Sequence, residues 1–578
     1  MKQVLNTIIL IVLILTVMTG AYAQQNTSYN ANTINIGGTY NSAFGTNSLN
    51  TTNTGTQNVA IGHSSLYSNT TGSYNCAIGI NSLYSNTTGG NNTAVGLQSL
   101  GSNTTGFNNT GTGYGSLNSN IAGNENTANG SYSLFLNTTG NYNTAIGFES
   151  LYSNTTGYNN TANGSLSLFS NTTGNYNTAT GYNALYYTTT GTYNTATGYN
   201  ALYFNTNGHE NTANGGYSLY ANTTGAYNTA YGYSSLASNT TGDNNTTNGY
   251  ASLSLNTTGA NNTASGFQSL LANTIGSNNT ASGYESLYTN SSGNNNTSNG
   301  YTSLFSNTTG NYNTASGGNS LYTNSTGSYN VANGYNALYS NTSGLYNTAN
   351  GYQSLYSTTT GFGNTTNGLG SLFYNKTGGN NTAMGDSAGY NSTGSKNVFI
   401  GNRAGYYETG SNKFYIASDS NKTILYGDLA TGQLLLGKAQ PNGYTFKGTR
   451  TLNVIGGLIA DSARIALVTG WADYVFDDSY KILPVEELEK YIKENKHLPN
   501  IPSATEVKDN GIELGTMDAK LLEKIEELDL YIVQQNKEIL KLQKNTEGQN
   551  KSIEQLQKQI DEMKPSSKNK EFFLRLKN

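Results

Sequence analysis

The sequence is poor in several residue types, and each shortage excludes a class of protein. Cys76 is its one cysteine, so neither an intramolecular disulfide nor a cysteine-based metal site is expected. Only six charged residues lie between Gln24 and Gly385. That region therefore lacks a basic stripe for nucleic acid and has almost no groups for acid–base catalysis. We expect no cofactor, no metal, no nucleic-acid partner and no enzymatic activity.

Long apolar runs are also scarce, and the one present lies at the N-terminus. Lys2 supplies a positive charge, "IILIVLILTVM" (Ile8 to Met18) an apolar core, and "AYA" (Ala21 to Ala23) a small-residue cleavage pattern. This combination is typical of a signal peptide, and the run is well short of the roughly 20 residues that span a bilayer. We expect residues 1–23 to be removed, no integral membrane segment afterwards, and a secreted or cell-surface protein.

One repeated unit makes up most of the remaining chain. Leucine occupies every seventeenth position from Leu49 to Leu372, and glycine keeps the same register from Gly45 to Gly385. The unit reads approximately N-T-A-x-G-Y-x-S-L-Y-x-N-T-T-G-x-Y, and such strict repetition is the signature of a solenoid. The residues expected to form the structural core of the repeat include Leu49, Leu66, Leu83, Leu151, Leu219, Leu287, Leu372, Gly62, Gly79 and Gly147.

The residue types within each unit favour strands over helices. Asn, Thr, Tyr and Gly dominate, so we predict one strand at "NTAxG" and a second at "SLYxNT". About twenty coils at a spacing of about 4.8 Å would form a parallel β-roll about 100 Å long. Each coil offers one leucine, one small residue such as Ala60, and aromatics such as Tyr67 and Tyr74 for its core.

Burying so few apolar side chains gives little free energy to offset the conformational entropy that a single chain loses when it folds. We therefore expect asparagine ladders between coils and a core shared by identical chains, which predicts a homo-oligomer. The residue before the first glycine column is apolar in early coils, as at Phe44 and Ile61, and polar in later ones, as at Asn163 and Thr180. The sequence leaves open whether this column faces inward or outward.

The unit "NTAIGFESL" (Asn143 to Leu151) resembles the head repeats of trimeric autotransporter adhesins over about residues 32–410. The resemblance implies a left-handed parallel β-roll built from three chains. The repeat of that family is usually shorter, and its Ile is often Asn, Thr or Ser here. The C-terminal membrane barrel of the family has no counterpart in this sequence, so self-translocation is not implied.

The composition changes after Thr423, and all five prolines lie beyond residue 440. We predict a helix that begins at Pro484, turns Leu488 and Ile492 inward and ends before Pro499. The predicted segments are a signal peptide (1–23), a β-roll fibre (24–410, with 17-residue repeats to about 385 and 16-residue closing repeats after), a β-rich connector (411–470), an assembly domain (471–515), a coiled coil (516–564) and a tail (565–578).

A heptad pattern predicts the coiled coil. Its seam contains Leu521, Ile525, Leu528, Ile532, Ile539, Leu542, Ile553, Leu556 and Ile560. Alternating Ile and Leu seams favour dimers in parallel model systems, whereas the adhesin resemblance implies a trimer. A lone amphipathic helix packed on its own domain is the alternative interpretation.

The segment from Trp471 to Leu528 is similar to a C-terminal module found on many exported Bacteroidetes proteins described as tail-fibre-like. That module in turn resembles the endosialidase-type intramolecular chaperone domain of phage tail spikes, a family of self-cleaving peptidases. The resemblance implies a domain that helps three chains find register. The family cleaves with a serine followed by aspartate, but Asp477 and Asp478 occupy that place here. If the chain did cleave itself, Ser479 and Lys481 would be the candidates.

These features favour an exported, adhesin-like fibre that presents Asn, Thr and Tyr to a cell-surface glycan or matrix protein and associates with itself. A self-cleaving tail-fibre protein is one alternative. An ice-binding solenoid is another, because the repeated "NTT" would place threonine columns about 4.8 Å apart. Outward tyrosines would oppose that function by spoiling the flatness of the face.

Overall fold

The computed structural model describes residues 27–29, 38–49, 52–439, 446, 449–464 and 471–563. The chain divides into two compact units, Met1–Gly457 and Leu458–Asn578, and each is described by itself. The predicted signal peptide and the predicted tail at 565–578 lie outside the described residues.

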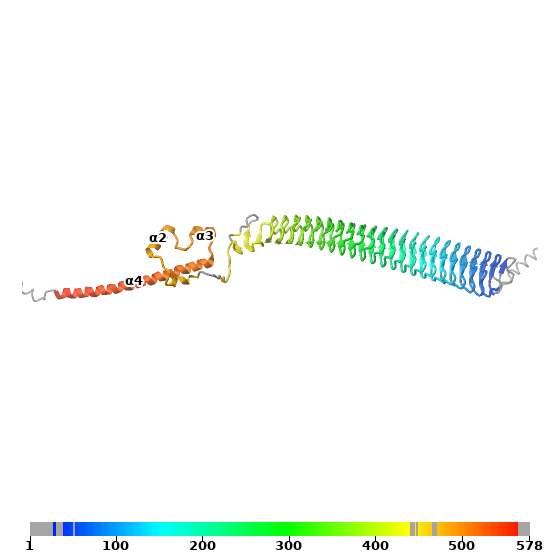
Figure 1. Cartoon of the computed structure of the whole chain (residues 1–578), viewed down its shortest axis with the longest axis horizontal. Helices are drawn as coiled ribbons and strands as arrows, with labels where there is room; N and C mark the ends of the chain where they lie inside the picture. The colour runs from blue at the N-terminus through cyan, green and yellow to red at the C-terminus, as the bar shows by residue number, and fades with distance from the viewer. Residues whose placement is uncertain are drawn as a thin grey trace, which may run out of the picture. The chain divides into compact units, whose positions relative to one another are not determined.

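The first unit is a parallel β-solenoid, which confirms the fold predicted from the repeat (Figure 1). In the described residues, the 24 strands from β1 to β24 are joined in chain order by parallel pairings between neighbours. Paired positions are offset by one repeat, as in Thr263 with Thr280. The offset shortens after β22, where Thr382 pairs with Val398, so the shorter closing register was predicted correctly.

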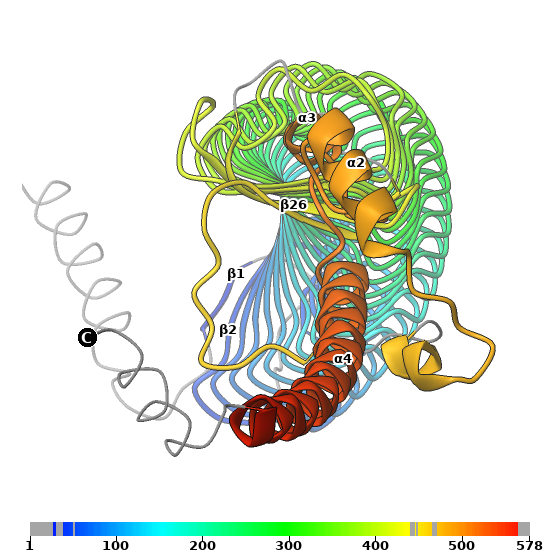
Figure 2. The ribbon, with the colours of Figure 1, turned by 90° about the vertical axis from the view of Figure 1, so that its left-hand side faces the viewer.

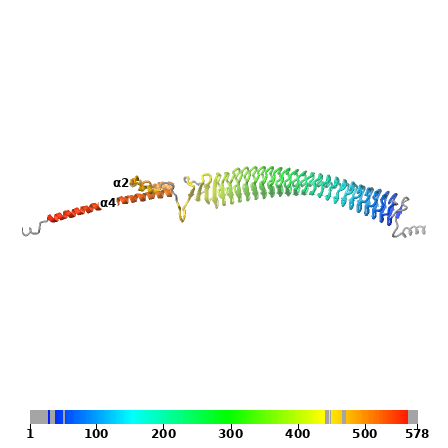
Figure 3. The same cartoon turned by 60° about the horizontal axis from the view of Figure 1, so that its bottom comes forward.

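The strands have these bounds: β1 Thr27–Tyr29, β2 Ser42–Phe44, β3 Val59–Ile61, β4 Cys76–Ile78, β5 Thr93–Val95, β6 Thr110–Thr112, β7 Thr127–Asn129, β8 Thr144–Ile146, β9 Thr161–Asn163, β10 Thr178–Thr180, β11 Thr195–Thr197, β12 Thr212–Asn214, β13 Thr229–Tyr231, β14 Thr246–Asn248, β15 Thr263–Ser265, β16 Thr280–Ser282, β17 Thr297–Asn299, β18 Thr314–Ser316, β19 Val331–Asn333, β20 Thr348–Asn350, β21 Thr365–Asn367, β22 Thr382–Met384, β23 Val398–Ile400, β24 Lys413–Ala417, β25 Thr423–Asp428, β26 Gln433–Ala439 and β27 Leu452–Val454. Viewed down the stack, successive coils lie behind one another (Figure 2), and the stack curves gently along its length (Figure 3).

The second predicted strand of each unit is instead a turn. In the coil after β8, Glu149 and Leu151 adopt φ values of 52° and 53°. Two left-handed residues so close together cannot continue a strand. The leucine still bonds to the next coil, because the Leu151 N–H donates to the carbonyl of Ser167 over 2.8 Å. Each coil therefore has one regular strand and one hydrogen-bonded turn.

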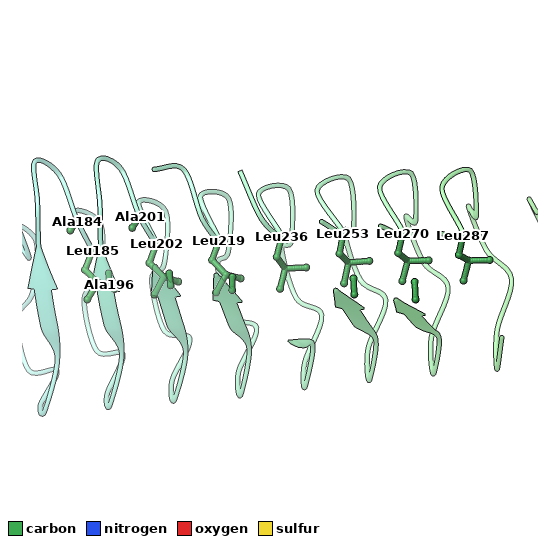
Figure 4. Packing of buried hydrophobic residues seen from close by; sticks show 14 of the residues in the cluster. Ala184, Leu185, Ala196, Ala201, Leu202, Leu219, Leu236, Leu253, Leu270 and Leu287 are labelled. Carbon is green, nitrogen blue, oxygen red and sulfur yellow. The ribbon is translucent and has the colours of Figure 1, made fainter. Parts of the chain in front are cut away.

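The leucine column and the alanine column form the apolar core. All of the leucines expected in the core of the repeat are 0 to 1% exposed, as is the alanine at the centre of most strands. Figure 4 shows the leucines from Leu185 to Leu287 aligned from coil to coil. The glycine after each strand permits this close stacking: Gly147 has φ 128°, and a Cβ there would lie 2.7 Å from the carbonyl carbon of Gly164.

Two columns of buried asparagine also lie in the interior. In the strand Asn column, the residue before each strand, the Asn143 amide donates to Asn126 Oδ1 over 3.1 Å and to the Gly157 carbonyl over 2.8 Å. In the turn Asn column, Asn154 donates to Asn137 Oδ1 over 2.8 Å and to the same Gly157 carbonyl over 2.9 Å. The predicted asparagine ladders are therefore present, and a buried amide that is bonded in this way avoids the desolvation penalty of an unpaired group.

The prediction that aromatic residues join the core was wrong. Tyr67 and Tyr74 are 40% and 60% exposed. The column before the glycines also faces outward, since Ile61 is exposed while Ala60 beside it is buried. The coil interior holds only small side chains, leucine and paired amides, so a tyrosine ring has no room inside. A single chain thus encloses its own core, and a core shared between chains is not needed to bury the leucines.

In the closing coils around β23, the large and the small core residues are interchanged relative to the earlier coils. Gly389 and Gly405 take the places of leucine, and Phe399 takes the place of the strand alanine. A Cβ at either glycine would overlap the ring of Phe399, which is 0% exposed. The antiparallel strands β25 and β26 follow β24, and Lys413 and Asp428 form an ion pair of 2.9 Å between β24 and β25.

The second unit contains the 3₁₀ helix η1 (Ala472–Phe476) and the helices α2 (Val485–Asn495), α3 (Ala504–Asn510) and α4 (Leu514–Met563). The predicted helix after Pro484 is α2. Leu488 is half-buried and lines a cavity beside α4, whereas Ile492 is 39% exposed and does not turn inward as predicted. Helix α3 was not predicted. Its signal is a capping box, in which Ser503 and Glu506 bond reciprocally at the helix start.

The turn Asn column is interrupted where threonine replaces asparagine at Thr188. Asn171 Oδ1 and Thr188 Oγ1 are both buried there and have no hydrogen-bond partner. On the other side of the gap, Asn205 Nδ2 donates to Gly208. An asparagine at this position would donate to Asn171 and accept from Asn205, as the other members of the column do.

We predict that Thr188→Asn stabilises the surrounding coils by about 1 to 3 kcal/mol, the cost of an unpaired buried polar group. Hydrogen exchange of strands β10 and β11, followed by mass spectrometry, measures the change as slower exchange. Thr241→Asn is the matched control, because Thr241 is exposed and the same substitution there completes no ladder. Unchanged or faster exchange in Thr188→Asn would contradict the role given to the ladder.

Candidate interaction surfaces

The outward face of the solenoid sheet is a regular array of hydroxyl and amide groups. Every strand from β5 to β18 begins with threonine. The third residue of β14 to β21 is always asparagine or serine. These side chains point away from the core, since strands such as β15 and β16 alternate exposed, buried, exposed. We call the first and third residues of β14 to β20 the sheet strip.

Stacked aromatic rings border the sheet strip. The column two residues after each strand contains Tyr233, Tyr250, Phe267, Tyr284 and Tyr301, whose ring centroids are 5.2 to 5.8 Å apart and whose planes differ by 7 to 12°. Two residues of extended chain span at most about 7 Å, so these rings lie beside the strip. On its other side, Tyr312, Tyr329 and Tyr346 stack two residues before β18, β19 and β20. We call these rings the border rings.

A further aromatic column directly follows the core leucines and, in the closing coils, the glycines Gly389 and Gly405 that replace leucine. It is continuous from Phe135 to Tyr220 and again from Tyr288 to Tyr406. Offset and stacked aromatic pairs add roughly 0.5 to 1.5 kcal/mol each beyond their burial. This column, which we call the leucine-adjacent column, therefore contributes to the cohesion of the coils as well as to their surface.

In the second unit, two tyrosine hydroxyls donate hydrogen bonds to glutamate side chains of helix α4. The Tyr474 hydroxyl donates to Glu523 over 2.5 Å, and the Tyr480 hydroxyl donates to Glu527. Lys524, mostly buried, pairs with both carboxylates at 2.8 and 2.9 Å. The apolar part of this contact includes Ala472 and Val475 of η1, which are fully buried. These bonds and contacts dock the segment from η1 to Tyr480 onto α4.

Hydrogen bonding and burial shift the pKa values of this cluster. The bond to Glu523, together with burial, raises the pKa of Tyr474 to about 12. Burial and the bond to Glu527 raise the pKa of Tyr480 well above its usual range. Burial opposes ionisation of Glu523, but the hydrogen bonds from Lys524 and Tyr474 outweigh it and hold the pKa of Glu523 below its usual value. The docked state therefore requires neutral tyrosines and an ionised Glu523.

The seam predicted on α4 forms an exposed apolar stripe in the single chain. Its nine residues are 45 to 58% exposed: Leu521, Ile525, Leu528, Ile532, Ile539, Leu542, Ile553, Leu556 and Ile560. At its N-terminal end the stripe borders a cavity of about 400 Å³ lined by Leu488, Leu498, Pro499, Leu521, Lys524, Ile525, Glu527, Leu528 and Tyr531. A seam this long and this exposed is the pattern of a helix that packs against other helices.

The two residues considered for self-cleavage lie on the surface. Ser479 and Lys481 are both exposed, in the segment between η1 and α2. Neither side chain forms a hydrogen bond with the other or with another described residue. Within the described ranges, no group of three or more His, Cys, Asp and Glu residues is arranged to hold a metal ion. No described helix has both the length and the apolar character that crossing a membrane requires.

Comparison of the chain with protein-family models, with curated proteins and with solved structures finds no match in any of the three. The resemblances to adhesin head repeats and to the tail-fibre-like module therefore stay as expectations from the sequence.

The tyrosine cluster predicts a pH dependence of docking. Because the pKa of Tyr474 rises from its ordinary value of about 10 to about 12 on docking, docking is favoured below about pH 10 and loses this contribution as the pH rises toward about 12. Trp471, the one tryptophan of the chain, directly precedes η1. We expect its fluorescence anisotropy to fall across that pH range.

The double variant Tyr474→Phe/Tyr480→Phe is the control, because it removes both hydroxyls and keeps both rings. Its anisotropy should already be low near neutral pH and should stay level across the same range. An unmodified protein whose Trp471 anisotropy does not change up to about pH 12 would show that the hydroxyls do not hold this segment.

Proposed function

We propose that the protein is an exported structural fibre, adhesin-like, whose solenoid presents a repetitive surface for attachment to cells, glycans or matrix proteins. The observation that carries the proposal is the solenoid itself, because its exposed columns repeat one set of side chains at the spacing of one coil. Each coil then offers a weak contact, and many equal contacts on a rigid support bind strongly together.

The second unit would assemble the fibre. The exposed seam of α4 supports association of identical chains, and we propose a homotrimer in which this unit sets the register of the three chains. Such a trimer would not need a shared solenoid core, since each chain buries its own leucines. Parallel β-stacks form slowly from non-local contacts, so a helical unit that brings chains together would assist their assembly.

One substitution tests assembly and attachment together. Ile539→Lys places a charge in the seam, while Leu540→Lys places the same charge on the neighbouring residue outside it; the two side chains are 51% and 52% exposed. We expect light scattering to show a trimer for the unmodified chain and for Leu540→Lys, and a monomer for Ile539→Lys. Retention on cells or immobilised matrix should fall by roughly a hundredfold or more in the monomer, because multivalency is lost.

Two results would contradict the proposal. If Ile539→Lys leaves the oligomeric state unchanged, the seam of α4 does not assemble the chains. If the unmodified oligomer binds neither cells, glycans nor matrix proteins, the solenoid does not serve attachment.

A further inference from the structure

We infer that the sheet strip and its border rings bind an extended, uncharged, β-linked polysaccharide chain that lies along the solenoid axis. The inference rests on the proposed attachment function and names the class of ligand. It is drawn from three properties of the strip: its chemistry, its period and its borders.

The chemistry of the strip suits a polyhydroxylated, neutral ligand. From β14 to β20 its side chains, which are exposed or half-buried, are threonine, serine and asparagine, with Val331 as the exception. Hydroxyls and amides can both donate and accept hydrogen bonds, as sugar hydroxyls do. Between Asp243 and Lys376 the solenoid carries one charged residue, Glu285. Such a neutral surface offers no counter-charge for a nucleic acid or a strongly acidic glycan.

The period of the strip suits an extended polymer. Neighbouring strands in a sheet are about 4.8 Å apart, and in extended β-linked chains such as cellulose and chitin each sugar advances the polymer by nearly this distance. Because neighbouring sugars in such chains are turned over relative to one another, sugars that face the same way would meet equivalent side chains on every second coil. A helical polymer, such as the α-linked chain of amylose, does not keep this alignment.

The border rings favour a single polysaccharide chain over a flat crystal face as the ligand. Within each stack the ring faces are occupied by neighbouring rings at 5.0 to 5.8 Å, so the inner rings expose their edges and, for tyrosine, their hydroxyls. Tyr250, Phe267, Tyr284 and Tyr301 are 41 to 60% exposed and stand beside the short side chains of the strip. These edges would contact the sides of a polymer chain. They would also keep a flat crystal face, such as ice, away from the threonines.

The test measures binding of cello- and chito-oligosaccharides of increasing length to the full chain, with malto-oligosaccharides as the α-linked comparison. We expect affinity to rise with length in the two β-linked series and not in the α-linked series, because each added sugar gains the contacts of one more coil. Phe267→Ala/Tyr284→Ala, which removes two border rings, should weaken binding of the longest β-linked probes by about tenfold.

The control variant Tyr339→Ala/Tyr356→Ala removes two stacked rings from the leucine-adjacent column and should keep unmodified affinity. Loss of affinity in this control alone would overturn the assignment to the strip. Equal affinity for α- and β-linked probes, or affinity that does not depend on length, would show that the ligand is not matched to the spacing of the coils.

The remaining outcomes separate this inference from the proposed function. A fibre that attaches to cells or matrix but binds no oligosaccharide refutes the inference and leaves the function standing, whereas a fibre that binds nothing refutes both. Thermal hysteresis without oligosaccharide binding would also overturn the inference, since it would show that the strip orders water.

Discussion

The structure of the solenoid depends on the pairing of buried asparagine side chains between neighbouring coils. An unpaired buried amide is costly, and most asparagines of the two columns pair with the equivalent residue one coil away, as Asn154 does with Asn137. A shift of one residue in any coil would leave two amides unpaired and would turn the strand residues to the wrong side. The strictness of the repeat follows from this constraint.

The same constraint determines which positions are free to carry function. Asn, Ala, Ser, Leu and Gly fill the interior columns, so most variation lies in outward columns such as those of Ser265 and Tyr284. Variation there changes the surface and leaves the backbone path unchanged. The result is a support that repeats chosen side chains at a fixed spacing, while the charged, proline-containing second unit provides the apolar seam for association.

The sequence predicted the parallel solenoid and the shorter closing register because both follow directly from the spacing of leucine and glycine. It could not predict the side on which tyrosines lie, since a tyrosine has an apolar ring and a polar hydroxyl and is found in both environments. The turn at Leu151 was also hidden, because only glycine commonly signals positive φ and leucine does not. The tyrosine contacts of Glu523 and Glu527 join segments about fifty residues apart, which local patterns do not reveal.

The most direct test of the account replaces one ladder asparagine by an apolar residue of similar size, Asn256→Leu. Asn256 donates to Asn239 and Gly259 and accepts from Asn273, so the substitution leaves buried partners unpaired. The account predicts that thermal unfolding followed by circular dichroism shows a lower midpoint, and that hydrogen exchange quickens in β14 and β15. An unchanged or higher midpoint would show that apolar burial alone holds the coils together.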